Sequence, residues 1–593
     1  MFLLIFLSLG IFSQSSIVFS IKDKDTKEPL PFCSVAIKGT TRGGVTNLEG
    51  NVRLSLNLEK DTLEIFYLGY ENTVIATKTL INAPTVFLTR KSFILNEVEI
   101  FSDDDYLFDI VNKCRKQLLK NKTITLSKVY HGIETTSNNL PLELVECYNN
   151  SKIEGVNVKN LYFKNGRVCL NNQNKYFTSI TSSIIITLLN LTKTNIYFPN
   201  QILQFRKQNM KKYFRISLIS VTDDYFNIGF SPKILDGNYF EGELWIDIKD
   251  YKLLKTKFNI VIAKTHPFIP IQIDSISNVS IEIIENFIKK NKKILPEYLI
   301  FNYSFQGSNT NDTNNVFNIN SKCLTYLYDY DKPFILPFFD YNQNVSDYDK
   351  IAIIPYNEIF WNNTAPFLLT ESQKEKLDFF AKFQNYSINN INDFEELFLL
   401  QIASLENKKD KYFLHFWDNK KRLKFNDFTL IYSATISTDG EEQKKKMKEM
   451  LIKHKFVVQI LLDIVELQDS LSWKSYTVFD ETKSFYYETF NENSNTWLNI
   501  FFDLCEIERL KMEDKLQKNH SSISEITAIY NETKENINKL STLYFYDTFF
   551  GKEKKDLIKW NKIVREKLEI DNIQYFIEYN TMIKKIMEEN NKE

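Results

Sequence analysis

The sequence predicts a multidomain α+β protein, and three changes in its hydrophobic pattern carry that prediction. Residues 15–90 hold short β-branched runs separated by turn residues, which is typical of a small β-sandwich. Residues 124–345 hold longer alternating runs, which indicate an antiparallel β-rich central domain. After residue 345 apolar residues recur at helical spacing, so we expect a helical connector over 346–410 and a C-terminal α+β domain over 411–593. Residues 91–123 are expected to form a linker between the first two domains.

An apolar run at the start of the chain predicts export. Residues 2–12 have the length of a signal-peptide hydrophobic region and are too short to span a bilayer, so we expect residues 1–13 to form a signal peptide. The first cysteine is Cys33, so no lipobox cysteine follows the run. We therefore predict an exported protein, and the resemblance of the first domain given below implies a Gram-negative-type envelope, with the protein in the periplasm, on the outer membrane or outside the cell and peripheral membrane association left open.

The first domain is predicted to contain five strands, at residues 17–21, 33–37, 51–56, 62–67 and 73–77. Four short segments accompany them: 29–31 (PLP), 35–41 (VAIKGTT), 46–50 (TNLEG) and 68–71 (LGYE). Together they resemble the carboxypeptidase regulatory-like domain found ahead of many TonB-dependent receptors. The resemblance implies a transthyretin-like, immunoglobulin-like sandwich that serves as an accessory or interaction module and not as a peptidase.

Two elements are expected in the linker. Residues 95–100 (LNEVEI) are similar to the strand that follows such a domain in other envelope proteins. This strand either lies at an edge of the chain's own sheet or pairs with a partner strand. Residues 105–120 follow a helical pattern whose apolar face we expect to pack on the next domain; its residues are Leu107, Ile110, Val111, Cys114 and Leu118.

The central domain is predicted to be an antiparallel sheet. Residues 240–248 alternate in polarity, Lys249 and Asp250 turn the chain, and residues 251–260 return, which is typical of a hairpin. Further alternating runs predict a curved sheet with helices on one face. The region loosely resembles the middle part of a large envelope family of unknown function. Such a sheet either encloses an ordinary packed core or cradles an apolar ligand such as a lipid.

Helices dominate the predicted C-terminal part. Thr370 and Gln373 form a capping box for a helix that begins at Glu371. A second helix is expected at residues 393–407. The last domain is predicted to hold strands at 427–436 and 456–467, a long helix from Thr496, and helices at 524–540 and 552–568.

The long helix resembles a zinc-protease helix whose metal ligands are missing. A metalloprotease helix carries H-E-x-x-H, in which two imidazoles hold zinc and the glutamate polarises water. The corresponding positions here are Trp497, Leu498 and Phe501. Because aromatic side chains would fill the metal cavity, we predict a degenerate metal site with no catalytic residue, no metal and no cofactor. The alternative is a buried helix without enzyme ancestry, and both interpretations predict no zinc at these positions.

Four segments in order carry this resemblance, which is to a family of secreted zinc-dependent proteases known mainly as a domain of unknown function. They are residues 423–428 (LKFNDF), 479–485 (FDETKSF), 502–507 (FDLCEI) and 546–551 (YDTFFG), followed by Trp560. Phe550 stands where the family carries a further histidine. The resemblance implies a zincin-like α+β domain that lacks its metal chemistry.

The remaining reactive residues give no further site. The five histidines are too far apart in sequence for a metal motif, and the six cysteines contain no C-x-x-C pair. Cys147 and Cys169 either form a disulfide across a hairpin or remain buried thiols. With 74 basic and 75 acidic residues, the chain shows no electrostatic footprint for nucleic acid.

These observations predict a non-catalytic binding or accessory protein of the cell envelope, with another envelope protein or an envelope ligand as its partner. Two alternatives remain: an envelope hydrolase with an unconventional site, and a carrier of lipid or glycan. Converging polar side chains in a cleft would favour the hydrolase. An apolar cavity of roughly several hundred cubic ångströms would favour the carrier.

Overall fold

The computed structural model describes residues 15–40, 43–91, 104–170, 183–268, 275–290, 293–309, 312–364, 368–382, 414–424, 454–467, 470–486, 492–518, 522–549 and 551–590. The predicted signal peptide, the strands at 95–100 and 427–436, the helix at 393–407 and Phe550 lie outside the described residues. The chain divides into two compact units, which are Met1–Phe334 with Gln343–Glu396, and Ile335–Asn342 with Leu397–Glu593.

The first domain is a sandwich of two small sheets, as predicted. One sheet has the order β4 (Asn51–Leu56), β1 (Ser15–Asp23), β7 (Thr85–Leu88), and the other has the order β3 (Gly43–Val45), β2 (Ser34–Ile37), β5 (Thr62–Phe66), β6 (Thr73–Ala76). The inward side chains form one apolar core between the sheets. The prediction missed β3 and β7, because strands of three and four residues carry too few alternations to stand out.

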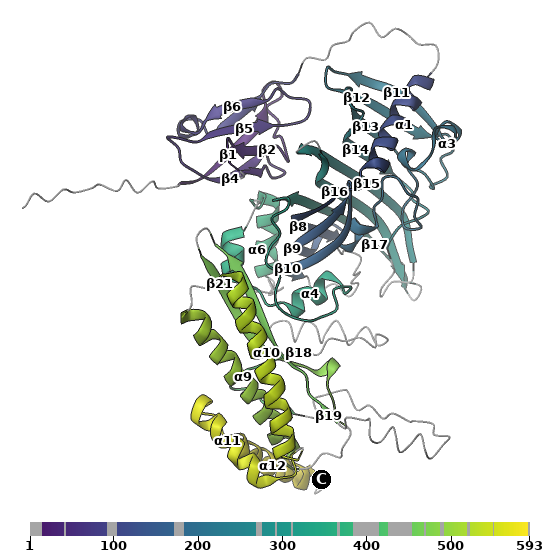
Figure 1. Ribbon diagram of the computed structural model, residues 1–593. Helices are drawn as coiled ribbons and strands as arrows, with labels where there is room; N and C mark the ends of the chain where they lie inside the picture. Colours follow the sequence, from purple (N-terminus) through teal and green to yellow (C-terminus); the bar gives the residue numbers. More distant parts are fainter. Residues whose placement is uncertain are drawn as a thin grey trace, which may run out of the picture. The chain divides into compact units, whose positions relative to one another are not determined.

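Ten antiparallel strands form the central sheet of the first unit (Figure 1). Their order is β10-β9-β8-β17-β16-β15-β14-β13-β12-β11, so the pairing of β8 with β17 joins two meanders. The predicted hairpin is confirmed as β13 and β14. The bounds are β8 (Ile124–Ser137), β9 (Leu140–Glu154), β10 (Asn157–Leu170), β11 (Phe214–Val221), β12 (Tyr225–Pro232), β13 (Glu241–Asp247), β14 (Leu253–Ile260), β15 (Ser275–Lys290), β16 (Lys293–Asn309) and β17 (Asp312–Tyr328).

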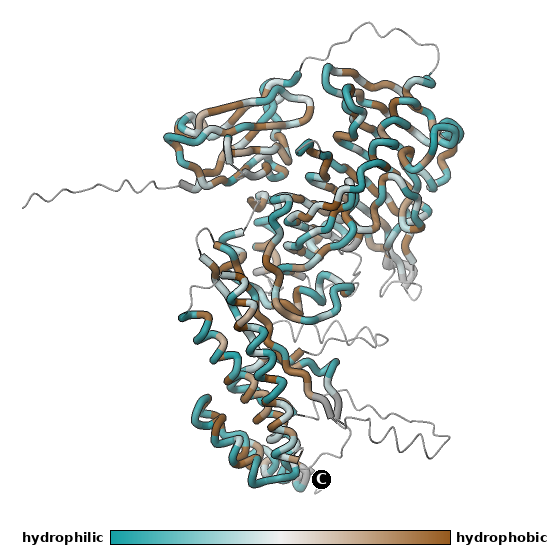
Figure 2. Tube along the Cα trace, viewed as in Figure 1, coloured by the Kyte–Doolittle hydropathy of each residue, from teal (hydrophilic) through white to brown (hydrophobic). Residues whose placement is uncertain are grey.

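One face of this sheet, the helix face, is covered by helices and a long loop. α1 (Asp105–Lys120) contacts β11, β13, α3 (Lys207–Tyr213) and η2 (Ile202–Gln204), and its five predicted inward residues are all buried. Another short helix, α2 (Ile184–Leu188), contacts β10. Figure 2 shows hydrophobic and hydrophilic residues alternating along the strands, which is the pattern that predicted the sheet.

The opposite face, the outer face, is also covered in part, which the prediction of helices on one face did not include. The first domain packs on this face, where the ring of Phe32 lies 4.8 Å from the ring of Tyr298. The hydroxyl of Ser34 also donates a hydrogen bond to the carboxylate of Glu297. One cross-strand row explains the position, because it changes from polar to apolar where the domain docks: Glu243, Lys257, Ile284, Ile300, Leu324.

Three helices of the connector pack at the β10 end of the sheet. They are α4 (Asp347–Ile353), α5 (Glu358–Thr364) and α6 (Glu371–Lys382). The predicted capping box is confirmed: the Gln373 N–H donates to Thr370 Oγ1 at 3.1 Å, and the Thr370 N–H donates to Gln373 Oε1 at 3.0 Å. The indole N–H of Trp361 donates to Asn165 Oδ1 at 2.7 Å and ties α5 to β10.

The described cysteines are free and buried, so the predicted disulfide alternative is wrong. The β9–β10 register places Cys147 opposite Gly166 and Cys169 opposite Leu144. Because side chains alternate along a strand, Cys147 and Leu144 point to opposite faces of the sheet, and so do Cys147 and Cys169. Burial raises the pKa of the Cys147 thiol well above its ordinary value, so this side chain behaves as a small apolar residue.

The described residues of the second unit form two small sheets and four α-helices. β18 (Leu414–Phe416), β21 (Leu471–Asp480) and β20 (Val458–Glu466) form a three-stranded sheet, and β19 (His454–Lys455) pairs with β22 (Phe485–Tyr486). α9 (Ser494–Lys518) contacts β20, β21, α10 (Ile523–Asp547), α11 (Lys554–Leu568) and α12 (Asn572–Asn590). The prediction included α9, α10 and α11 but missed α12. None of the described helices is both long and apolar enough to cross a membrane.

Candidate functional site

The positions predicted as a degenerate metal site lie in the core of the second unit. Trp497, Leu498 and Phe501 on α9 are at most 1% exposed. The indole N–H of Trp497 donates to Thr548 Oγ1 at 3.0 Å, and the hydroxyl of Tyr544 donates to the Trp497 carbonyl at 2.8 Å. Indole, isobutyl and phenyl groups do not ligate metals, so what these three side chains contribute is packing.

α9 is buried on more sides than the sequence indicated. Trp497, Ile500, Leu504 and Ile507 recur at helical spacing and are buried, and the residues between them are buried as well. The reason is that strands β20 and β21 and the helices α10, α11 and α12 all contact α9. An apolar stripe predicts one covered face of a helix, and it carries no information about a second layer on the other side.

A buried polar network crosses the same helix. Asp503 is fully buried and accepts hydrogen bonds from Arg422 Nη1 at 2.8 and 2.9 Å and from Trp417 Nε1 at 2.7 Å. Asn572 Nδ2 donates to Asp503 Oδ2 at 2.6 Å. Sequence reasoning missed this network because an acid on a helix is usually solvated. The carboxylate accepts all of these hydrogen bonds from side chains of other segments, so it ties α9 to its neighbours.

The described histidines do not converge with acids into a metal centre. Within the described ranges, no group of three His, Cys, Asp or Glu side chains could hold a metal ion. His131 lies on the helix face with Nδ1 2.8 Å from Thr325 Oγ1, and burial lowers its pKa to about 4. His415 Nε2 lies 2.9 Å from Glu481 Oε2, which is a pair and not a cluster.

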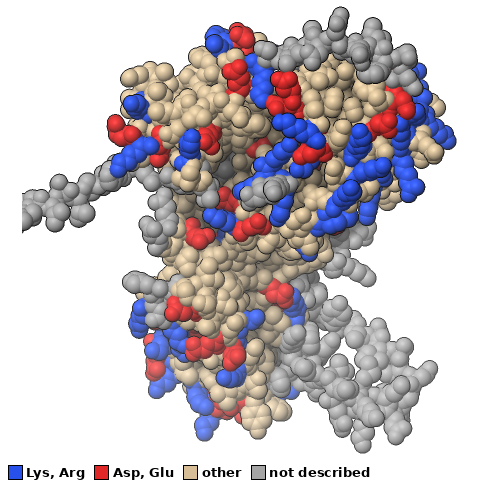
Figure 3. All heavy atoms as spheres, turned by 45° about the horizontal axis from the view of Figure 1, so that its top comes forward, with Lys and Arg blue, Asp and Glu red and all other residues tan. Residues whose placement is uncertain are grey.

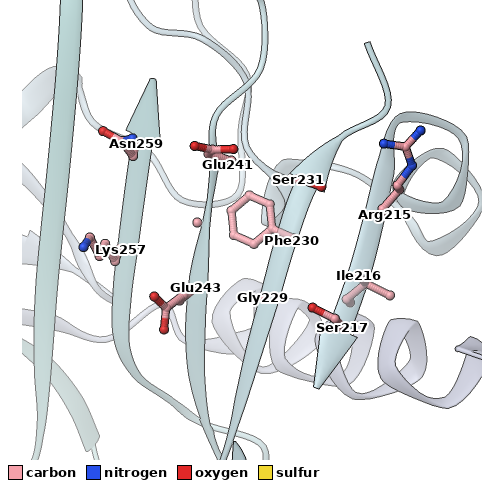
Figure 4. A pocket seen from close by; sticks show the side chains of 11 residues that line it. Arg215, Ile216, Ser217, Gly229, Phe230, Ser231, Glu241, Glu243, Lys257 and Asn259 are labelled. Atoms are coloured by element: carbon pink, nitrogen blue, oxygen red, sulfur yellow. The ribbon is translucent and has the colours of Figure 1, made fainter. Parts of the chain in front are cut away.

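An open polar hollow, which we call the outer trough, lies on the outer face over β11–β14 (Figure 4). Its volume is about 410 Å³, within the usual range for a small-ligand site. Arg215 and Lys257 bring positive charge to it, and Glu241 and Glu243 bring negative charge. Gly229 leaves part of the floor without a side chain. Groups of both signs on a flat floor can bind a polar ligand that itself carries both charges.

A smaller cavity, the Glu285 crevice, lies on the helix face beneath the loop that leads into η2. Its volume is about 20 Å³, enough for about one water molecule, and Leu191, Phe198, Phe240 and Phe258 line it with Glu285. Glu285 Oε2 is buried and has no hydrogen-bond partner among the described residues. Burial raises the pKa of Glu285 to about 7. The crevice is far smaller than the cavity expected of a lipid carrier.

The raised pKa of Glu285 predicts a pH effect on stability. Its folded pKa of about 7 exceeds the ordinary value of 4.5, so the folded chain holds an extra proton between these values and loses stability as the pH rises through them. The loss amounts to about 3 kcal/mol, from about 1.4 kcal/mol per pKa unit. In urea unfolding, we expect the free energy of unfolding of Glu285→Gln to exceed that of the wild type at about pH 8. The difference between the two should be smaller at about pH 5.

The free energy of unfolding of the variant must be compared with that of the wild type at each pH. His131, whose folded pKa is lowered to about 4, makes stability rise with pH over an overlapping range and so opposes Glu285. Glu282→Gln is the matched control, since Glu282 lies on the same strand, on the outer face, and accepts a hydrogen bond from Asn302 at 2.9 Å. Equal pH dependence of Glu285→Gln and wild type would contradict the assignment.

Comparison with known proteins bears on the first domain. Residues 20–100 match the family model of the CarboxypepD_reg-like domain. A segment of 96 residues is 33% identical to the TonB-dependent receptor SusC of Bacteroides thetaiotaomicron, and covers 16% of this chain and 9% of the receptor. The chain thus spans less than a tenth of this relative. The first domain is a CarboxypepD_reg-like domain, as the sequence resemblance implied, and it points to a protein of the cell envelope.

Solved structures show only a weak likeness. A DUF1329 family protein from Desulfovibrio piger is 8% identical, covering 40% of this chain and 93% of that chain, with a TM-score of 0.17. A LolA superfamily protein from Nitrosomonas europaea is 10% identical over 38% and 93%, with a TM-score of 0.15. The MucA/MucB complex of Pseudomonas aeruginosa gives 7% identity over 39% and 100%, with a TM-score of 0.13. Scores this low carry no argument about function.

Proposed function

We propose that the chain is an exported envelope protein that acts by binding and not by catalysis, with a zincin-like C-terminal unit that has lost its metal chemistry. The observation that carries this proposal is the closed core at Trp497, Leu498 and Phe501. A catalytic zinc keeps one coordination position open to water or substrate. At these positions the helix instead presents aromatic and aliphatic groups that contact Tyr544 and Phe545.

The protease-like segments lie around α9, which supports the proposed ancestry. The N–H of Leu423 donates to Asn499 Oδ1 at 2.8 Å. The rings of Phe479 and Phe502 lie 6.2 Å apart, and a Cβ at Gly551 would lie 3.1 Å from the Cβ of Trp497. Segments that are far apart in the sequence thus share one core, as members of a single ancestral domain would.

The outer face of the central sheet supports a binding role. The CarboxypepD_reg-like domain packs over the apolar part of this face, on β15–β17, and the outer trough lies over β11–β14 of the same sheet. Since Arg215, Lys257, Glu241 and Glu243 line the trough, the ligand that fits it best is a polar envelope molecule or protein segment that carries both charges.

Metal content tests the non-catalytic proposal. Purified protein is incubated with zinc, passed through gel filtration and measured by inductively coupled plasma mass spectrometry. We expect well under one zinc per chain, because the helix positions offer no ligand. His415→Ala is the matched variant, since it removes the histidine that contacts Glu481 and reveals whether adventitious zinc resides there. Stoichiometric zinc together with peptidase activity would overturn the proposal in favour of a hydrolase.

A carrier of an apolar ligand is a second candidate, for which the favourable observation is the unpartnered Glu285 Oε2, although the crevice beside it holds about one water molecule. A protonated carboxyl there could donate a hydrogen bond to the polar end of such a ligand. Native mass spectrometry of protein purified from envelopes tests this candidate. A co-purified lipid that is lost in Glu285→Gln would support the carrier, and protein of the bare chain mass would reject it.

A further inference from the structure

Three loops at one end of the central sheet expose large apolar side chains to solvent. They precede η2, join β12 to β13, and join β14 to β15. The exposed fractions are 80% for Ile196, 41% for Tyr197, 69% for Ile234, 86% for Leu235, 67% for Val261 and 60% for Ile262. Single exposed apolar residues are ordinary on a protein surface, but six on three adjoining loops mark an interaction surface. We call these six side chains the apolar tips.

Backbone hydrogen bonds hold the three loops together. The N–H of Asn200 donates to the Asn238 carbonyl at 2.8 Å, and the N–H of Lys264 donates to the Gly237 carbonyl at 2.9 Å. Gly237 has φ +81°, and a Cβ at this position would lie 2.7 Å from the Ile262 carbonyl oxygen, so glycine permits the close approach. The tips therefore belong to one connected surface and do not project independently.

Basic side chains surround the apolar tips. Lys193, Lys212, Lys233 and Lys264 are exposed on the same loops or on the adjoining end of α3. Lys233 Nζ donates to the Lys211 carbonyl at 2.7 Å, which places α3 beside the β12–β13 loop. Figure 3 shows lysine and arginine gathered over the side of the first unit that bears α1 and α3. Among the described residues of these loops, Asp236 is the one acid, and it accepts hydrogen bonds from Asn238.

We propose that the apolar tips insert into the surface of an anionic lipid bilayer while the surrounding lysines contact its phosphate groups. Apolar side chains gain free energy on leaving water for the acyl boundary, and lysines gain from the negative surface potential of the lipid. The two contributions act at the same end of the sheet. The proposal goes beyond the binding role above and does not depend on the ligand of the outer trough.

The charge pattern selects a membrane over a protein partner. The centre of a protein interface is depleted in lysine, whereas interfacial membrane segments combine exposed apolar side chains with lysine at their polar margin. Lysine also reaches phosphate with a flexible stem, so it does not require a shaped partner surface. A second copy of this chain would bring the same positive charges together and would be repelled.

Vesicle flotation of the full chain tests the proposal. We expect the protein to float with phosphatidylglycerol-containing vesicles, to float less with phosphatidylcholine alone, and to be released by salt. The double variant Leu235→Asp/Ile262→Asp should lower the partition coefficient by at least about tenfold, since each tip loses the transfer of one large apolar side chain. Lys193→Gln/Lys233→Gln/Lys264→Gln should weaken binding to anionic vesicles and leave the phosphatidylcholine result unchanged.

Ile124→Asp is the matched control. Ile124 is 60% exposed, as Ile262 is, but it begins β8 at the opposite end of the sheet. The control should float like the wild type, and circular dichroism should confirm that all variants are folded. Equal flotation of the Leu235→Asp/Ile262→Asp variant and the wild type would overturn the proposal. So would dimers in analytical ultracentrifugation that this variant abolishes, because the tips would then contact a second copy.

Discussion

Replacing Asp503 with alanine is expected to lower the free energy of unfolding of the second unit by about 3–5 kcal/mol. The change leaves Arg422, whose side chain is 4% exposed, without its carboxylate in the core. It also removes the acceptor for the Trp417 indole N–H and for Asn572. Urea unfolding followed by tryptophan fluorescence measures the effect, since four of the six tryptophans lie in this unit: Trp417, Trp473, Trp497 and Trp560.

Two comparisons separate the buried charge from a general loss of an acid. Glu532→Ala removes an exposed ion pair with Lys515 in the same unit, where the two side chains are 46% and 53% exposed, and should cost at most about 1 kcal/mol. Arg422→Met/Asp503→Leu removes both buried charges together and should recover most of the lost stability. If Asp503→Ala shifts the unfolding midpoint no more than Glu532→Ala does, the network does not stabilise the unit.

The sequence predicted elements whose periodicity is local. α1 shows this well, since Leu107, Ile110, Val111, Cys114 and Leu118 recur at helical spacing and are all buried. The β13–β14 hairpin and the capping box at Thr370 are also confirmed, because each depends on residues within one short segment. The first domain was identified by resemblance, because several of its turn and strand segments occur in the order and spacing of a known small sandwich.

Features that depend on distant residues could not be predicted in this way. The docking of the first domain joins Ser34 to Glu297, which lie 263 residues apart, and no local pattern records that contact. The network at Asp503 joins residues 81 apart, and the Glu285 crevice requires a loop to lie over β15. Whether Leu235 and Ile262 are exposed depends on which distant segments pack over them. A pattern of apolar residues alone favours burial.

Truncating Trp497 to alanine is expected to destabilise the second unit by about 3–5 kcal/mol. The indole is fully buried and its ring lies 4.9 Å from Phe456 and 5.2 Å from Phe545, so its removal opens a cavity in the centre of the core. Trp497→Phe should cost less, because it keeps much of the volume and because Thr548 retains its hydrogen bond to the Tyr544 carbonyl at 2.6 Å. Urea unfolding followed by circular dichroism measures both variants without relying on the fluorescence of the residue replaced.

Tyr546→Ala provides the matched control, since Tyr546 is an aromatic residue of α10 that is 83% exposed, and its truncation should change stability by at most about 0.5 kcal/mol. Added zinc is expected to leave the unfolding curves of Trp497→Ala and wild type unchanged, because no described cluster of ligands faces the cavity that the truncation creates. Zinc that restores stability to Trp497→Ala would show that a metal site persists around α9. In that case the aromatic residue would cover such a site, and the proposal that aromatic packing has replaced the metal would be wrong.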